Sequence, residues 1–217
     1  MGRWGHRLFQ SDNDADIAVE IIDEIVGESD LPDSAFGLDT EHENQILEQV
    51  RQKLDAGTGE TLLERSLEGA QTKDPEDFLE RKKYRPIALS AILMMAGAKI
   101  SDEHVGRLRA IALHSPGPES YVLPLAGDNY FRGPDKKQYL AALDHYRQGL
   151  PCDFHKPTCH ACGEVGCDLG RELLKCGGCR NRRAAAWFCD KDCQKRLWKI
   201  HKTICGDGML GPGTLNV

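Results

Sequence analysis

Residues 189–205 read CDKDCQKRLWKIHKTIC, and this stretch decides how the C-terminal part of the chain folds. It holds two metal-capable pairs, Cys189 with Cys193 and His201 with Cys205. Residues four apart in a helix project from the same face, one turn apart, so each pair can chelate one ion. The stretch therefore predicts a helix with two chelating pairs, each of which supplies half of a metal site.

Two C-x2-C pairs precede this stretch, Cys159 with Cys162 and Cys176 with Cys179. A C-x2-C turn brings two sulfurs to one ion. Eight ligands in four pairs fit two tetrahedral zinc ions and leave no coordination position open, whereas catalytic zinc needs an open position. The sequence therefore predicts two structural Zn²⁺ ions.

The other cysteines and the nearby histidines are interpreted as non-ligands. Cys152 and Cys167 fall outside the four pairs and are read as spare thiols, although Cys167 lies close enough to compete with Cys162 if the long loop folds differently. His155 lies four residues before Cys159 and His160 lies inside the first turn, and both are also read as non-ligands. All nine cysteines lie in residues 152–217, and without a signal peptide we expect them to be thiolates that bind metal in a reducing compartment.

Charge divides at the same place as the cysteines. Residues 152–217 carry 11 Lys+Arg and 7 Asp+Glu, formally +4, and residues 1–151 carry 17 and 27, formally −10. Seven thiolates and two Zn²⁺ ions add −3 to the C-terminal part and leave it at about +1. Basic residues in the C-terminal part permit a weak phosphate-binding face, and they lie at Arg180, Arg182, Arg183, Lys195, Arg196, Lys199 and Lys202. The acidity of residues 1–151 argues against strong nonspecific DNA binding.

Residues 1–151 are predicted to form an acidic, Cys-free helical domain. Apolar residues recur at helical spacing in residues 12–26, around Ile46, Val50 and Leu54 up to Gly57, and at 62–67. Asp74-Pro75 is expected to open a helix, Arg85-Pro86 to break one, and residues 87–98 to form the central core helix. Ser101 should cap the next helix, residues 119–134 should form a loop, and Asp135 should cap a last helix that ends at Gly149.

The helical part contains no recognisable enzyme motif. His42 begins a possible H-E-x-x-H metal helix, but position 46 is Ile, and no phosphate-binding glycine loop or G-x-S-x-G pattern occurs. The apolar run of residues 87–98 has twelve positions, short of the ~20 that a membrane helix needs. We therefore expect no enzymatic activity and no membrane span, while an uncharacterised enzymatic role of residues 1–151 stays open as an alternative.

Residues 159–205 resemble a MYND-type zinc finger. The stretch matches the signature C-x3-C-Q-x3-W-x2-H-K-x2-C at every position, and the matching residues are Cys189, Cys193, Gln194, Trp198, His201, Lys202 and Cys205. The related HIT-type finger shares the cysteine order, but Gln194, Trp198 and Lys202 favour MYND. The spacing departs from the compact family pattern, with 13 residues between Cys162 and Cys176, 9 between Cys179 and Cys189, and Phe188 in place of the usual tyrosine.

This resemblance implies how the ligands pair. In the family the pairs interleave, first with third and second with fourth, so one zinc ion would take Cys159, Cys162, Cys189 and Cys193. The other would take Cys176, Cys179, His201 and Cys205. The expected fold is thus mainly α, with a helical domain (1–151), a linker (152–158), a two-zinc MYND-type module with a C-terminal helix (159–205) and a flexible tail (206–217). Residues 1–151 resemble no characterised family.

The resemblance also implies a function. MYND modules bind short proline-containing peptides, and the residues at the peptide groove correspond to Gln194 and Trp198. We therefore expect an intracellular, cytoplasmic or nuclear adaptor that binds protein partners. A weak nucleic-acid-binding or transcription-associated role is the alternative. The cofactor motif of the SET methyltransferases, some of which contain a MYND module, is absent.

Overall fold

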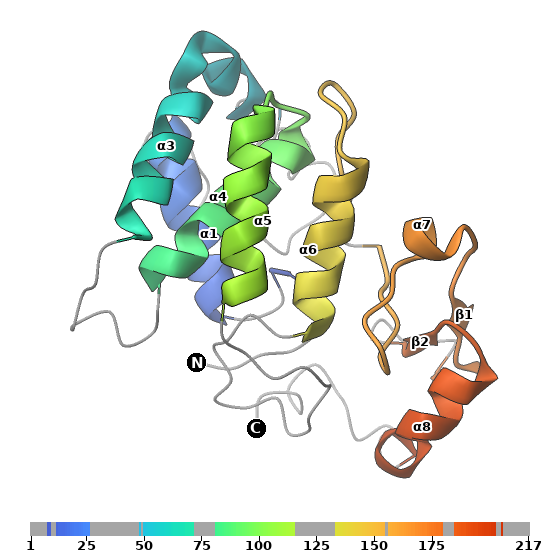
Figure 1. Cartoon of the computed structure of the whole chain (residues 1–217). Coiled ribbons are helices and arrows are strands. Elements are labelled where there is room, and N and C mark those ends of the chain that lie inside the picture. Colours follow the sequence, from blue (N-terminus) through green and yellow to red (C-terminus); the bar gives the residue numbers. More distant parts are fainter. Residues whose placement is uncertain are drawn as a thin grey trace. The chain divides into compact units, whose positions relative to one another are not determined.

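The computed structural model of the chain describes residues 8–9, 12–26, 48, 50–71, 81–115, 133–154, 156–179, 185–202 and 205. Helices dominate these residues, which confirms the predicted mainly α fold class (Figure 1). Residue contacts divide the chain into two units. We call residues 14–115 with 142–154 the helical unit, and residues 1–13, 116–141 and 155–217 the cysteine-rich unit.

The helical unit is built around α4 (Arg81–Ala96). All residues from 87 to 96 are buried, as expected for a helix that is apolar on nearly every side. Ser90 is the one polar residue among them, and its hydroxyl donates to the carbonyl oxygens of Pro86 and Ile87 at 2.7 and 3.0 Å. The predicted central core helix is therefore confirmed.

The predicted break at Arg85-Pro86 is wrong, because α4 runs through Pro86 without ending. Proline lacks the N–H that would bond to the carbonyl of Lys82, a loss that costs about 3 kcal/mol inside a helix. Burial of one Leu or Ile side chain contributes about 1.5–3 kcal/mol, and Ile87, Ile92 and several neighbours are fully buried. Packing of the following two turns thus outweighs the missing hydrogen bond.

Two further helices of this unit follow the predicted pattern. α1 (Asp12–Val26) has the predicted bounds and buries Ile17, Ile21 and Ile22. The helical pattern predicted to end at Gly57 passes into a π-helical turn, η1 (Leu54–Thr58), where Gly57 has a left-handed φ of 92°. α3 (Gly59–Gly69) begins directly afterwards and packs on α4.

Ser101 begins α5 (Asp102–His114), as predicted, since its hydroxyl oxygen accepts a hydrogen bond from the His104 N–H at 3.3 Å. We expect Ser101→Ala to lower the free energy of unfolding by about 1 kcal/mol, because the first turn loses its capping oxygen. Urea denaturation followed by circular dichroism measures this change. Ser101→Asp keeps a capping oxygen and should stay near wild type; equal losses in both variants would contradict the capping role.

α6 (Gly133–His145) differs from the prediction at both ends. It begins two residues before Asp135, so the predicted cap and the end of the predicted loop are misplaced, and it ends four residues before Gly149. The predicted inward positions Tyr139 and Leu143 are buried, whereas Tyr146 is half-buried and follows the helix. A capping residue is a short-range signal, whereas packing also determines where a helix begins and ends. Helix ends predicted from caps alone are therefore uncertain by a few residues.

The segment after α6 returns to the end of α4. The Tyr146 hydroxyl donates to the carbonyl of Ala98, and the Gly149 and Cys152 N–H groups donate to the carbonyls of Gly97 and Met94, each at 2.9 Å. The helix predicted from Asp74-Pro75, residues 119–132 of the predicted loop and the predicted tail at 206–217 lie outside the described residues. In the described part of the chain, no helix combines the length and hydropathy that a membrane span requires.

Candidate metal centres

Four cysteines of the first and third predicted pairs come together. The ligand atoms of Cys159, Cys162, Cys189 and Cys193 all lie within 4.8 Å of one another. The Cys162 sulfur lies 3.3 Å from that of Cys189 and 3.8 Å from that of Cys193. With Zn–S bonds of about 2.3 Å, a tetrahedral site has sulfur–sulfur distances near ~3.8 Å. This first cluster, with four cysteine ligands, fits one zinc ion.

The second and fourth pairs form the other group, made of Cys176, Cys179, His201 and Cys205, again with ligand atoms within 4.8 Å. The Cys205 sulfur lies 3.6 Å from that of Cys176 and 3.7 Å from that of Cys179. His201 Nε2 lies 3.3 and 3.5 Å from the same two sulfurs. Zinc bound to nitrogen and sulfur implies about 3.5 Å between the two ligand atoms. This second cluster, with three cysteines and one histidine, therefore fits a second zinc ion.

A short antiparallel sheet separates the two clusters. β1 (Leu174–Lys175) pairs with β2 (Trp187–Phe188), Leu174 opposite Phe188. Because the strands run in opposite directions, Cys176 after β1 and Cys189 after β2 lie at opposite ends of the sheet. The Cys176 N–H donates to the Ala186 carbonyl at 2.8 Å and extends this pairing.

α8 (Lys191–His201) links both clusters. Cys193 lies in its first turn and His201 in its last, about 12 Å apart at 1.5 Å per residue. The Asp190 carboxylate caps the helix by accepting the Cys193 N–H at 2.8 Å, and this donor holds the pKa of Asp190 below its usual range. A single capped helix thus sets the positions of two ligands that belong to different zinc ions.

The longer loops of this chain are accommodated by local structure. The segment between Cys162 and Cys176 contains α7 (Gly166–Leu169), which ends at Gly170 with a left-handed φ of 61°. Phe188, which replaces the usual tyrosine, is buried. Its ring centroid lies 5.7 Å from that of His201 and 6.0 Å from that of His160, so the phenyl ring fills the interior without a hydroxyl group to satisfy.

The protonation of the cysteines shows why each cluster needs a cation. Burial, together with the neighbouring sulfurs of Cys162 and Cys159, raises the pKa of Cys189 above its usual range. Burial likewise raises the pKa of Cys193 to about 11. Burial opposes ionisation of Cys159 as well, but the backbone N–H groups of Cys189 and Cys162 outweigh it and lower that pKa. Four crowded thiolates therefore require a positive ion among them, which Zn²⁺ supplies.

The second cluster has the same electrostatic character. Burial, followed by the sulfurs of Cys176 and Cys179, raises the pKa of Cys205 to about 12. Burial also lowers the pKa of His201, which favours the neutral imidazole, the form that ligates a metal. At neutral pH the histidine is thus ready to bind, while the Cys205 thiol needs the metal to lose its proton.

Three N–H donors, two from side chains and one from the backbone, support the ligand sulfurs. Arg196 Nη2 donates to the Cys193 sulfur at 2.9 Å, the Cys189 N–H donates to the Cys159 sulfur at 3.4 Å, and Gln194 Nε2 donates to the Cys176 sulfur at 3.6 Å. Such donors orient ligands and reduce the charge on sulfur. In the sequence, the i,i+3 spacing from Cys193 is the sole signal for this contact, so the sequence alone indicates Arg196 only as a surface cation.

The predicted peptide-binding residues lie one turn apart on α8. Gln194 is half-buried and points its amide nitrogen toward Cys176. Trp198 is 44% exposed, and its ring centroid lies 5.9 Å from that of the ligand His201. Both residues are therefore held at positions set by the second zinc cluster.

The remaining candidates belong to neither four-residue group. Cys152 is half-buried and Cys167 is exposed, and the predicted competition of Cys167 with Cys162 does not occur. His160 Nδ1 accepts the Trp187 N–H at 3.1 Å, a structural role. His155 and the basic loop of Arg180, Arg182 and Arg183 lie outside the described residues.

This arrangement defines the C-terminal part as a zinc finger with two structural ions. Comparison with protein families adds that residues 159–205 match the family model of the MYND finger. The C-terminal module is therefore a MYND-type zinc finger, a type of module that mediates protein interactions, and residues 1–158 lie outside the match. No curated protein and no solved structure matches the chain.

Proposed function

We propose that the chain is a non-catalytic adaptor whose MYND finger binds short, proline-containing segments of partner proteins. The exposed indole of Trp198 carries this proposal. Soluble proteins bury most of a tryptophan side chain, and exposed aromatic residues at rigid positions are typical of binding sites. Trp198 is held rigidly because it shares α8 with Cys193 and His201, one ligand of each zinc ion.

Gln194 supports the same groove. A thiolate can only accept hydrogen bonds, so the donor contact to Cys176 orients the amide nitrogen toward the cluster. That orientation directs Oε1 away from the sulfur, where it can accept an N–H from a bound peptide backbone. An indole face stacks on a proline ring, so Trp198 and Gln194 together would recognise an extended proline-containing segment.

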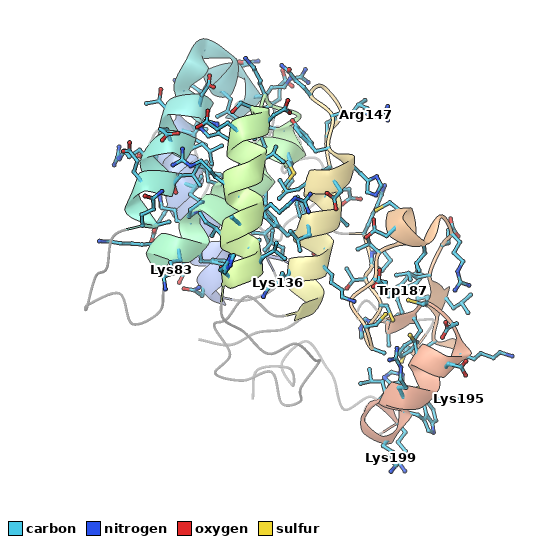
Figure 2. All side chains as sticks on the ribbon, viewed as in Figure 1. Lys83, Lys136, Arg147, Trp187, Lys195 and Lys199 are labelled. Atoms are coloured by element: carbon cyan, nitrogen blue, oxygen red, sulfur yellow. The ribbon has the colours of Figure 1, made fainter. Side chains whose placement is uncertain are left out.

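Charge favours a protein partner over nucleic acid. The Arg196 guanidinium contacts the Cys193 sulfur, and the Lys195 amine pairs with Asp192 at 3.3 Å. Lys195 and Lys199 extend outward from α8 (Figure 2). With a finger near +1 and a helical part at −10, phosphate contacts would be few. Because the thiolate ligands need reducing conditions, we place the adaptor inside the cell, in the cytoplasm or the nucleus.

A peptide array on the zinc-loaded protein tests this proposal. We expect wild type to bind a subset of proline-containing peptides and Trp198→Ala to weaken binding at least roughly tenfold, since the stacking surface is lost. Leu174→Ala is the matched control, because Leu174 is also exposed in the finger but lies on β1. Equal binding by wild type and Trp198→Ala would remove the groove assignment, and so would an equal loss in the control.

A further inference from the structure

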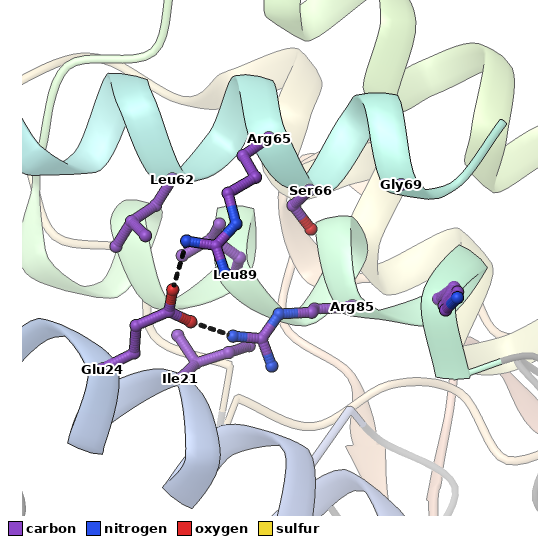
Figure 3. Close-up of a pocket in the computed structure, with 9 residues that line it drawn as sticks. Ile21, Glu24, Leu62, Arg65, Ser66, Gly69, Arg85 and Leu89 are labelled. Atoms are coloured by element: carbon purple, nitrogen blue, oxygen red, sulfur yellow. Dashed lines mark hydrogen bonds and ion pairs between the residues drawn. The ribbon is translucent and has the colours of Figure 1, made fainter. Parts of the chain in front are cut away.

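A pocket of about 200 Å³ lies between α1, α3 and α4 of the helical unit (Figure 3). Its apolar wall is formed by Ile21, Leu62 and Leu89, one residue from each helix. An engineered protein cavity of about 150 Å³ holds benzene, so a pocket of this size holds a ligand of roughly six to ten non-hydrogen atoms.

Cations gather at the polar side of the pocket. Arg65, Lys82 and Arg85 line it, and Glu24 is the acidic residue that lines it with them. The Glu24 carboxylate bridges the two guanidinium groups, with Oε1 at 3.3 Å from Arg65 Nη1 and Oε2 bonded to Arg85 Nη2 (Figure 3). The spacing of the two arginines therefore suits a carboxylate.

Arg85 also meets a second carboxylate, because its Nη1 lies 3.7 Å from Glu20 Oε2. Glu20 does not line the pocket and contacts Arg85 from outside it. Arg65 and Arg85 thus meet two carboxylates, and the position between the two guanidinium groups is one that a carboxylate occupies.

Ser66 gives an independent indication of a polar ligand. It lines the pocket from α3, it is 9% exposed, and its hydroxyl oxygen makes no hydrogen bond within the described residues. In Figure 3 this hydroxyl points from α3 toward α4. A buried hydroxyl without a partner is energetically unfavourable, and an acceptor in the pocket would satisfy it.

We propose that this pocket binds a small organic carboxylate with a short hydrocarbon body. The ligand carboxylate takes the place of Glu24 between Arg65 and Arg85, and it accepts a hydrogen bond from the Ser66 hydroxyl. The hydrocarbon part of the ligand packs on Ile21, Leu62 and Leu89. Glu24 acts as an internal competitor, since its side chain is partly exposed and can turn to solvent. All these residues belong to the helical unit, so this site is independent of peptide binding by the finger.

Calorimetric titration of the full-length, zinc-loaded protein with hexanoate tests the proposal. We expect saturable binding of hexanoate and none of 1-hexanol, which has the same body without the charge. Hexyl phosphate and inorganic phosphate are titrated in the same way. Tighter binding of either phosphate than of hexanoate would overturn the assignment of a carboxylate, and equal binding of hexanol would overturn the role of the cations.

Three variants locate the site. Glu24→Gln removes the competitor and should tighten hexanoate binding several-fold, whereas Arg85→Met should weaken it at least roughly tenfold. Arg65→Met should also weaken it and provides a second test if Arg85→Met does not fold, because the Arg65 side chain is 76% exposed and contributes little to packing. Lys83→Met, next to Lys82 on α4 but outside the pocket lining, is the control and should bind like wild type. Absence of hexanoate binding in both wild type and Glu24→Gln would refute the proposal.

Discussion

Purified protein should contain two zinc ions per chain, and a strong chelator should unfold the finger while α4 stays folded. Structural zinc sites contribute about 10–16 kcal/mol of apparent binding free energy, and the finger's interior is made largely of its ligands and the residues packed on them. α4 lies in the apolar core of the helical unit and contains no cysteine. Metal analysis and hydrogen exchange, recorded before and after chelation, measure the two effects separately.

Cysteine variants sharpen this test. Cys176→Ser removes a ligand of the second cluster and should reduce zinc content below two. Cys167→Ser is the matched control, since Cys167 is exposed and lies in neither four-residue group, and it should keep two ions. A wild-type content of one ion or none, or a loss of zinc in Cys167→Ser, would contradict the assignment of the ligands.

Truncation of the core helix should have the second large effect. Ile92 is 0% exposed in the C-terminal half of α4, and Ile92→Ala should lower the free energy of unfolding by about 2–5 kcal/mol because it leaves a cavity. Urea denaturation followed by circular dichroism measures the change.

The control for Ile92→Ala is Leu113→Ala on α5, where the side chain is 55% exposed. It should change the free energy of unfolding by no more than about 0.5 kcal/mol. A loss below about 1 kcal/mol in Ile92→Ala would show that α4 is not the centre of the core.

The metal ligands could be predicted from sequence because their signal is local. A C-x2-C turn specifies its own geometry, whatever the rest of the chain does. The prediction that the other two pairs lie in one helix is only partly right, because α8 contains Cys193 and His201 but not Cys189 or Cys205. Their spacing still brings each pair to one metal site. How the four pairs combine is not local, since Cys162 meets Cys189 across 27 positions. That pairing followed from the resemblance to a known finger, and the structure groups the ligands in the same way.

Other features depended on packing between distant segments and could not be predicted. Pro86 breaks an isolated helix, but in α4 the burial of the following turns stabilises the helical path. The pocket requires Glu24, Arg65 and Arg85 to converge from three helices, and nothing in the spacing of single charges along the sequence indicates that convergence. The helix start predicted at Asp135 is another such case, because α6 begins two residues earlier, at Gly133.

The interleaving of ligand pairs makes loading of the two metals thermodynamically linked. The chain between Cys162 and Cys189 is a loop closed by the first zinc ion, and it contains Cys176 and Cys179, half of the second site. The first ion to bind therefore bears the entropic cost of closing chain segments that the other ion also needs closed, so the other ion binds more tightly. At limiting zinc, chains with both ions and chains with none should coexist, and chains with a single ion should be scarce.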